Sequence, residues 1–259
     1  MLGPLFVAHN NRERQSGSGP PNAMRFAMAC LFTAVAANPL QRFATDIVAP
    51  IFFAWFASSE GVAKLHQEHV DSPIVRHMIK GSVLASAPDD AKLDFARSSA
   101  GAAVADFMRL EQQHIGQWKI ERIVEAAGPS FDAPSARAQL MSEVISSKVV
   151  VYSFVDCPWC LLAKERLMAV AQADSVPWLT TDDVSVIELE DLGQDGKSLR
   201  AALALTTGRT SMPSVWLNGR CVGGWTDGDM PAGEAGLCLD ASPGFEELSD
   251  GNRMRELLS

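Results

Sequence analysis

The sequence predicts an α/β domain in the C-terminal half of the chain, preceded by a mostly helical extension. Three observations lead to this fold class. From residue 149 onward, short runs of β-branched and aromatic residues alternate with longer amphipathic segments, as the strands and helices of one sheet do. Before that point, apolar residues recur at helical spacing. The two parts also differ in charge: residues 1–131 hold 12 Lys and Arg against 12 Asp and Glu, whereas residues 132–259 hold 10 against 19, which accounts for the whole net charge of −9.

Size and composition exclude several classes of protein. A chain of 259 residues that is 47% hydrophobic is long and apolar enough for a sizeable core, so disorder throughout is excluded. No run of about 18 apolar residues occurs, and we therefore expect no membrane-spanning helix. The negative charge, without a Lys/Arg cluster, argues against binding to nucleic acid or an anionic membrane. Five cysteines are too few, and odd in number, for a disulfide-stapled secreted scaffold.

Residues 1–45 are expected to form a disordered or targeting leader. The first 23 residues have the composition of a loop, and the apolar stretch that follows Met24 ends in small residues of the kind a signal peptidase recognises. Residues 1–45 also contain four Arg, no Lys and one acid, a bias found in transit peptides. A poorly ordered leader followed by a buried helix explains the same pattern. We expect an intracellular protein, either cytoplasmic or organellar.

Residues 46–127 are expected to form three or four helices of unknown role. Two pairs of potential metal ligands lie one helical turn apart in this region: His66 with His69, and Glu111 with His114. Solvated polar helix faces are the simpler explanation, because the two pairs need not meet in space. We therefore expect no metal site here.

A turn at residues 128–134 marks the predicted boundary, after which residues 132–259 are expected to form one domain that folds and reacts on its own. All the residues proposed below for the chemistry lie in it, so we expect the helical half to contribute none. The expected elements, in order, are a helix over 135–146, a strand over 149–154, a helix over 157–173, a strand over 184–190, a helix over 196–206, a strand over 214–217, a turn at 218–219, a strand over 220–223 and a helix over 245–258.

The most informative feature is the motif Cys157-Pro158-Trp159-Cys160. A cysteine that follows a buried strand and opens a helix lies beside unpaired backbone N–H groups and the positive end of the helix dipole, and both favour the thiolate. Cys160 lies one helical turn further on, close enough to form a disulfide with Cys157. A zinc site would need a second pair of ligands, but residues 132–259 contain no second C-x-x-C and no histidine. The pattern therefore favours thiol–disulfide chemistry.

Four segments together resemble the glutaredoxins of the thioredoxin-like fold: residues 149–160 (VVVYSFVDCPWC), 208–213 (GRTSMP), 215–219 (VWLNG) and 223–227 (GGWTD). The resemblance covers about residues 135–259 and lies in the order and spacing of these segments. It implies a thiol–disulfide oxidoreductase that uses glutathione as co-substrate. Its expected partners are glutathione and glutathionylated or disulfide-bonded proteins, and we expect a monomer without a metal.

The resemblance also implies a role for each site residue. Cys157 is the expected nucleophile and Cys160 the resolving thiol, while Met212, before an expected cis Pro213, would pair its main chain with the cysteinyl unit of glutathione. Three further pairs of residues are expected to bind glutathione. Gly223 and Gly224 would let the backbone approach it closely, and Thr226 and Asp227 would hold its γ-glutamyl group. Lys164 and Arg209 are candidates for binding its glycyl carboxylate.

This sequence departs from the family pattern near the nucleophile. Phe154 stands where a basic residue is common, and Asp156 adds a negative charge directly before Cys157. Thiolate stabilisation and glutathione affinity are therefore expected to be weaker than is usual in the family. An alternative function is an iron–sulfur cluster carrier ligated by Cys157 and glutathione, but members with that function usually lack a proline at the position of Pro158. A glutathione transferase is disfavoured, because its helices follow the thioredoxin-like unit and here they precede it.

Overall fold

The computed structural model describes residues 51, 87–173, 176–226, 237–239, 244–249 and 252–258. The predicted leader, His66, His69 and Asp227 lie outside these ranges. The described elements, in order, are α6 (Asp89–Arg97), α7 (Ser99–Ala126), α8 (Ala133–Glu143), β1 (Val149–Ser153), α9 (Pro158–Ala171), the 3-10 helix η3 (Thr181–Asp183), β2 (Val184–Glu188), α10 (Gly193–Thr207), β3 (Ser214–Leu217), β4 (Arg220–Gly223), α11 (Phe245–Leu248) and α12 (Asn252–Leu258).

The described strands form one mixed sheet in the order β2-β1-β3-β4. The central strand β1 is parallel to β2 and antiparallel to β3, so Val151 pairs with Val186 on one side and with Val215 on the other. A tight turn at Asn218 and Gly219 joins β3 to the antiparallel strand β4. Every residue of β1 is buried, as its run of β-branched side chains predicts. This arrangement confirms the predicted thioredoxin-like fold class.

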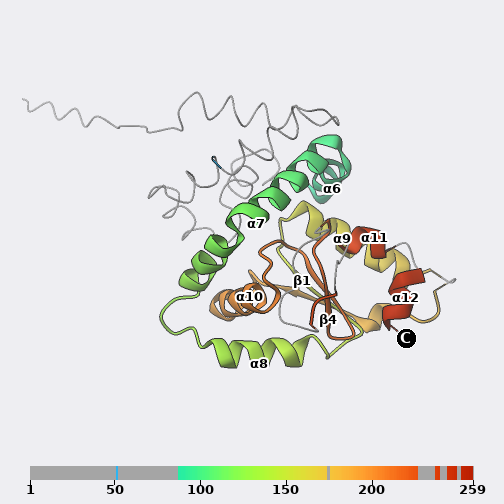
Figure 1. Ribbon diagram of the computed structural model, residues 1–259. Coiled ribbons are helices and arrows are strands. Elements are labelled where there is room, and N and C mark those ends of the chain that lie inside the picture. The colour runs from blue at the N-terminus through green and yellow to red at the C-terminus, as the bar shows by residue number, and fades with distance from the viewer. Residues whose placement is uncertain are drawn as a thin grey trace, which may run out of the picture.

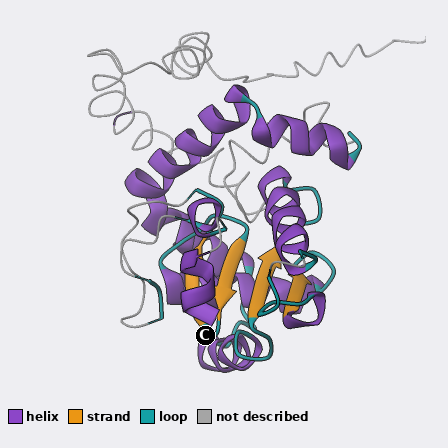
Figure 2. Cartoon of the chain, turned by 90° about the vertical axis from the view of Figure 1, so that its right-hand side faces the viewer, coloured by secondary structure: helices purple, strands orange, loops and turns teal. Residues whose placement is uncertain are grey.

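Helices cover both faces of the sheet, and the alternation of side chains along β1 determines which residues meet them (Figures 1 and 2). Val150 and Tyr152 face a core shared with α8 and α10, which contribute Leu140 and Leu199. The neighbouring positions of β1 face the opposite core, formed with α9, α11 and α12. The two-residue period of the strand therefore divides the interior into two apolar clusters.

Helices α6 and α7 pack directly against this α/β unit, and Figure 1 shows α7 crossing it as a long diagonal helix. Phe107 of α7 belongs to an apolar cluster that includes Trp159 and Leu162 of α9. Further along, Ile123 of α7 packs on Ala201 of α10. The helical extension therefore shares its core with the predicted domain, and separate folding of residues 132–259 stays a prediction.

Two further results concern the helices. The expected helix over 245–258 is instead two helices, α11 and α12, and the first ends where the Ser249 hydroxyl donates to the Glu246 carbonyl. In the ranges that the structure describes, no helix combines the length and the apolar character needed to cross a membrane.

Candidate functional site

Cys157 lies at the junction of β1 and α9, as expected. It occupies the N-cap position of α9, and its Sγ accepts a hydrogen bond of 3.3 Å from the Cys160 N–H. The thiol also lies 3.8 Å from the Met212 carbonyl oxygen, to which it donates when protonated. A negative charge on this sulfur is stabilised by that N–H and by the positive end of the helix dipole. The local geometry thus suits a nucleophilic thiolate.

Cys160 has a different environment. Its side chain is buried, and burial, followed by the hydrogen bond with Cys157, raises the pKa of the Cys160 thiol well above its usual value. Cys157 is only partly buried and faces a pocket residue, Met212. This asymmetry suits a nucleophile at Cys157 and a protonated second thiol at Cys160.

A pocket beside the cysteine pair contains part of the predicted glutathione site. Met212 and Thr226 line it together with Trp159, and the Met212–Pro213 peptide bond is cis, as expected. Gly223 leads to this edge of the pocket with a φ of 96°, a backbone conformation that favours glycine. Among the residues that the structure describes, the lining consists of Ala105, Met108, Arg109, Gln112, Lys119, Trp159, Thr210, Ser211, Met212, Trp225 and Thr226.

Helix α7 forms one wall of this pocket, whereas the sequence analysis expected all the site residues to come from residues 132–259. Its lining residues Ala105, Met108, Arg109 and Gln112 lie at i, i+3, i+4 and i+7 and so share one helix face. This helical spacing is the only sequence signal for the α7 wall. The spacing shows that the four residues share a helix face, but it does not show which surface that face contacts.

Gln112 connects α7 to the loop that precedes the cis proline. Its amide nitrogen donates to the Gly208 carbonyl at 3.0 Å, and its amide oxygen accepts from the Thr210 N–H at 3.1 Å. The Thr210 hydroxyl donates to the same oxygen. A single side chain from the helical extension therefore holds the backbone that leads to Met212.

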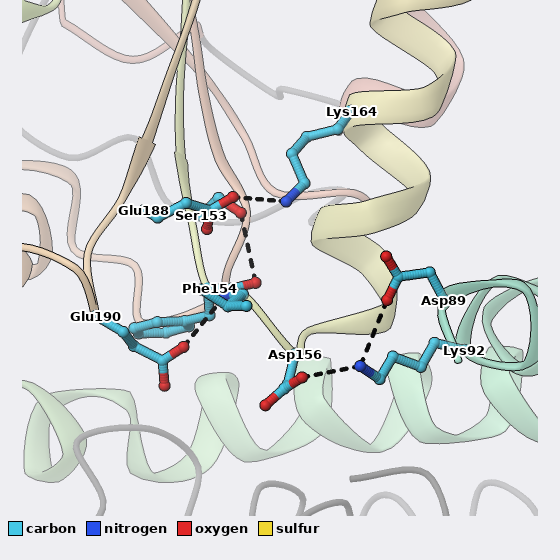
Figure 3. Close-up of polar contacts among 9 residues, drawn as sticks. Asp89, Lys92, Ser153, Phe154, Asp156, Lys164, Glu188 and Glu190 are labelled. Carbon is cyan, nitrogen blue, oxygen red and sulfur yellow. Dashed lines mark hydrogen bonds and ion pairs between the residues drawn. The ribbon is translucent and has the colours of Figure 1, made fainter. Parts of the chain in front are cut away.

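The two predicted cations lie elsewhere. Lys164 forms an ion pair with Glu188, with 2.6 Å between Nζ and Oε1 (Figure 3). Arg209 is buried, and its charge acts on Cys221 instead. Neither belongs to the pocket lining, whereas Arg109 of α7 does. The role of Lys164 and Arg209 in binding a carboxylate therefore gains no support from their positions.

Asp156, expected to oppose the charge of the thiolate, is paired with a lysine from α6. Lys92 Nζ lies 2.8 Å from Asp156 Oδ1 and 3.5 Å from Asp89 Oδ1 (Figure 3). The Lys92 side chain is 6% exposed, and its hydrogen bond with Asp156 raises the lysine pKa above its ordinary value. Because the pair is formed, much of the Asp156 charge next to Cys157 is neutralised.

Comparison with known proteins gives matches to part of the chain. No protein-family model matches. The chain is 35% identical over 108 residues to glutaredoxin-C4 of Arabidopsis thaliana, which covers 41% of this chain and 71% of that protein. It is 38% identical over 95 residues to glutaredoxin-C6 of Oryza sativa subsp. japonica, covering 36% of this chain and 72% of that protein. A solved wheat glutaredoxin is 28% identical, with 48% of this chain and 92% of that chain covered, at a TM-score of 0.35.

Proposed function

Since this chain belongs to the glutaredoxin family, we propose that it is a glutathione-dependent oxidoreductase that reduces protein–glutathione mixed disulfides and protein disulfides. The observation that carries this proposal is the position of Cys157. Its sulfur accepts a hydrogen bond from the Cys160 N–H at the N-terminus of α9. The same sulfur faces Met212, which precedes the cis proline, beside a pocket. A thiolate held there can attack a disulfide whose glutathione half lies in that pocket.

The proposed reaction has two exchange steps. In the first, the Cys157 thiolate attacks the glutathione sulfur of a protein–glutathione mixed disulfide. That disulfide breaks, the protein thiolate leaves and takes up a proton, and a Cys157–glutathione disulfide forms. In the second step, a glutathione thiolate attacks the glutathione sulfur of this disulfide, which regenerates the Cys157 thiolate and releases glutathione disulfide. Main-chain pairing at Met212 and close approach at Gly223 and Gly224 would position glutathione for both steps.

Turnover of a glutathionylated peptide tests the proposal. The full chain is mixed with the peptide and reduced glutathione, and release of the free peptide thiol is followed by mass spectrometry. We expect saturable, multiple-turnover release well above the rate of the uncatalysed exchange. A rate no greater than that of glutathione alone would contradict the proposal.

Cys160 is expected to be needed for only one of the two proposed activities. A mixed disulfide with glutathione is released by a second glutathione, whereas an intermediate with a protein substrate is released most easily by a neighbouring thiol. Cys160→Ser should therefore retain most of the turnover of a glutathionylated peptide and lose at least about tenfold in reduction of a protein disulfide. Parallel assays on both substrates measure this division, and an equal loss of both activities would refute it.

The protein is expected to purify colourless after anaerobic preparation with glutathione. Pro158 has no N–H to donate toward a bridging sulfur and stiffens the start of α9, which disfavours a cluster shared by two copies of the chain. Absorption spectroscopy, iron analysis and size-exclusion chromatography check this. A brown dimer with stoichiometric iron would instead support the iron–sulfur carrier.

Lys92 is expected to support catalysis by neutralising Asp156. Lys92→Met leaves the Asp156 carboxylate beside the Cys157 thiolate without its partner, and we expect the second-order rate of disulfide attack to fall roughly 3- to 10-fold at low ionic strength. High salt should reduce the difference. The matched control is Lys92→Met with Asp156→Asn, which removes both charges and should recover most of the rate. Equal rates in the single and double variants would contradict this role.

A further inference from the structure

A second pair of cysteines meets at the edge of the sheet, apart from Cys157 and Cys160. Residues 237–239 run parallel to the edge strand β4: the Cys221 N–H donates to the Leu237 carbonyl at 2.7 Å, and the Leu239 N–H donates to the Cys221 carbonyl at 3.0 Å. Cys221 and Cys238 are therefore direct partners across this bridge. Neighbouring strands lie about 4.8 Å apart, which is within the range of about 4.4–6.8 Å between the Cα atoms of a disulfide.

The side chains of both cysteines enter the same apolar cluster. Cys221 is 1% exposed and Cys238 is 3% exposed, and both belong to the core that also contains Trp216. The two thiols are in hydrogen-bond contact, and this contact together with burial raises the pKa of Cys221. The two sulfurs thus already face each other in a dry environment that suits an uncharged linkage.

We propose that Cys221 and Cys238 form a disulfide under oxidising conditions, which attaches residues 237–239 covalently to the edge strand of the sheet. The oxidant is glutathione disulfide. One cysteine thiolate attacks it to form a mixed disulfide and release one glutathione, and the second cysteine then displaces the other glutathione. The two protein thiols lose two electrons and two protons in total, and one molecule of glutathione disulfide becomes two glutathione thiols. The step uses neither Cys157 nor Cys160, so it is independent of the proposed function.

The position of this disulfide connects it to the pocket. After Cys221, β4 continues to Gly223, and the chain then passes through Gly224 to Trp225 and Thr226, which line the pocket. The proposed Cys221–Cys238 bond closes a loop that contains these residues. Closing a loop restricts the unfolded chain, and the oxidised protein is therefore the more stable form.

The test uses a full-length chain in which Cys30, Cys157 and Cys160 are replaced by serine, so that only the proposed pair remains. The protein is refolded from denaturant in buffers of different ratios of reduced to oxidised glutathione, because refolding gives the oxidant access to thiols that are buried in the native state. It is then quenched with acid, alkylated and digested for mass spectrometry. We expect a linked peptide containing Cys221 and Cys238 in oxidising buffer, and a Tm about 5–10 °C higher than in reducing buffer.

The unaltered chain, treated in the same way, should give the same linked peptide. A matched control adds Cys238→Ser, which should abolish both the link and the difference in Tm between the two buffers. Alkylation of both thiols after oxidising refolding would overturn the proposal. Attachment of glutathione to either cysteine without a link would also overturn it. Neither of these two results would affect the interpretation of the turnover assay, because the variants tested here lack Cys157, the proposed nucleophile.

Discussion

Replacing Cys157 by serine is expected to abolish turnover of glutathionylated peptide, with a loss of at least about 1,000-fold in rate. The reason is chemical, since a hydroxyl remains protonated at neutral pH and cannot replace a thiolate as the attacking group. The fold should tolerate the change. Cys157 is the N-cap of α9, and serine is among the residues that best accept a hydrogen bond at this position.

Two measurements accompany this experiment. The melting temperature of Cys157→Ser should lie close to that of the unaltered protein, which separates loss of chemistry from loss of structure. Cys160→Ser serves as the matched control, because it removes the other thiol of the same motif and should retain most of the activity. Undiminished activity in Cys157→Ser would show that the nucleophile lies elsewhere.

Glu111→Gln is expected to destabilise the protein by about 3–5 kcal/mol. Glu111 is 0% exposed and Lys119 is 1% exposed, and their charged atoms lie 3.2 Å apart. Eight residues of a straight helix span about 12 Å. Helix α7 is kinked at Ile115, where φ is −130°, so the two side chains lie on either side of the kink. Removing the carboxylate leaves the Lys119 charge buried without its counter-ion, and the cost of that desolvated charge dominates the effect.

Urea unfolding monitored by circular dichroism measures this cost. Replacing both members of the pair, as Glu111→Leu with Lys119→Met, removes both charges and should be far less destabilising than the single change, within about 2 kcal/mol of the unaltered protein. Asp106→Asn is the matched exposed control, since it breaks the surface pair with Arg109 on the same helix and should cost less than about 1 kcal/mol. If Glu111→Gln costs no more than Asp106→Asn, the buried pair is not important for stability.

The ion pair between Glu111 and Lys119 also affects the pocket, because Lys119 lines the pocket. A kink stabilised by Glu111 and Lys119 orients the part of α7 that carries Gln112, which holds the backbone at Gly208 and Thr210. Loss of stability in Glu111→Gln should therefore be accompanied by weaker binding of glutathione at the proposed site.

The sequence alone determined the elements whose signals are local. The strands β3 and β4 begin and end at the predicted residues, and β1 differs by one residue, because β-branched runs and an Asn-Gly turn act over a few neighbouring positions. The position of Cys157 at the start of α9 follows from the same local pattern. The final helix was predicted less well, because the hydroxyl of Ser249, which bonds the Glu246 carbonyl at the end of α11, competes with continuation of the helix.

Only the tertiary structure decided what surrounds the cysteines. Lys92 and Asp156 are 64 residues apart, and Gln112 and Thr210 are 98 apart, so no periodic pattern connects them. Lys164 was a candidate for a carboxylate of glutathione, but in the folded chain it pairs with the carboxylate of Glu188 on a neighbouring strand. A periodic sequence pattern reports which face of a helix is apolar, and it carries no information about the surface against which that face packs. The wall that α7 adds to the pocket was therefore determined by packing between distant segments.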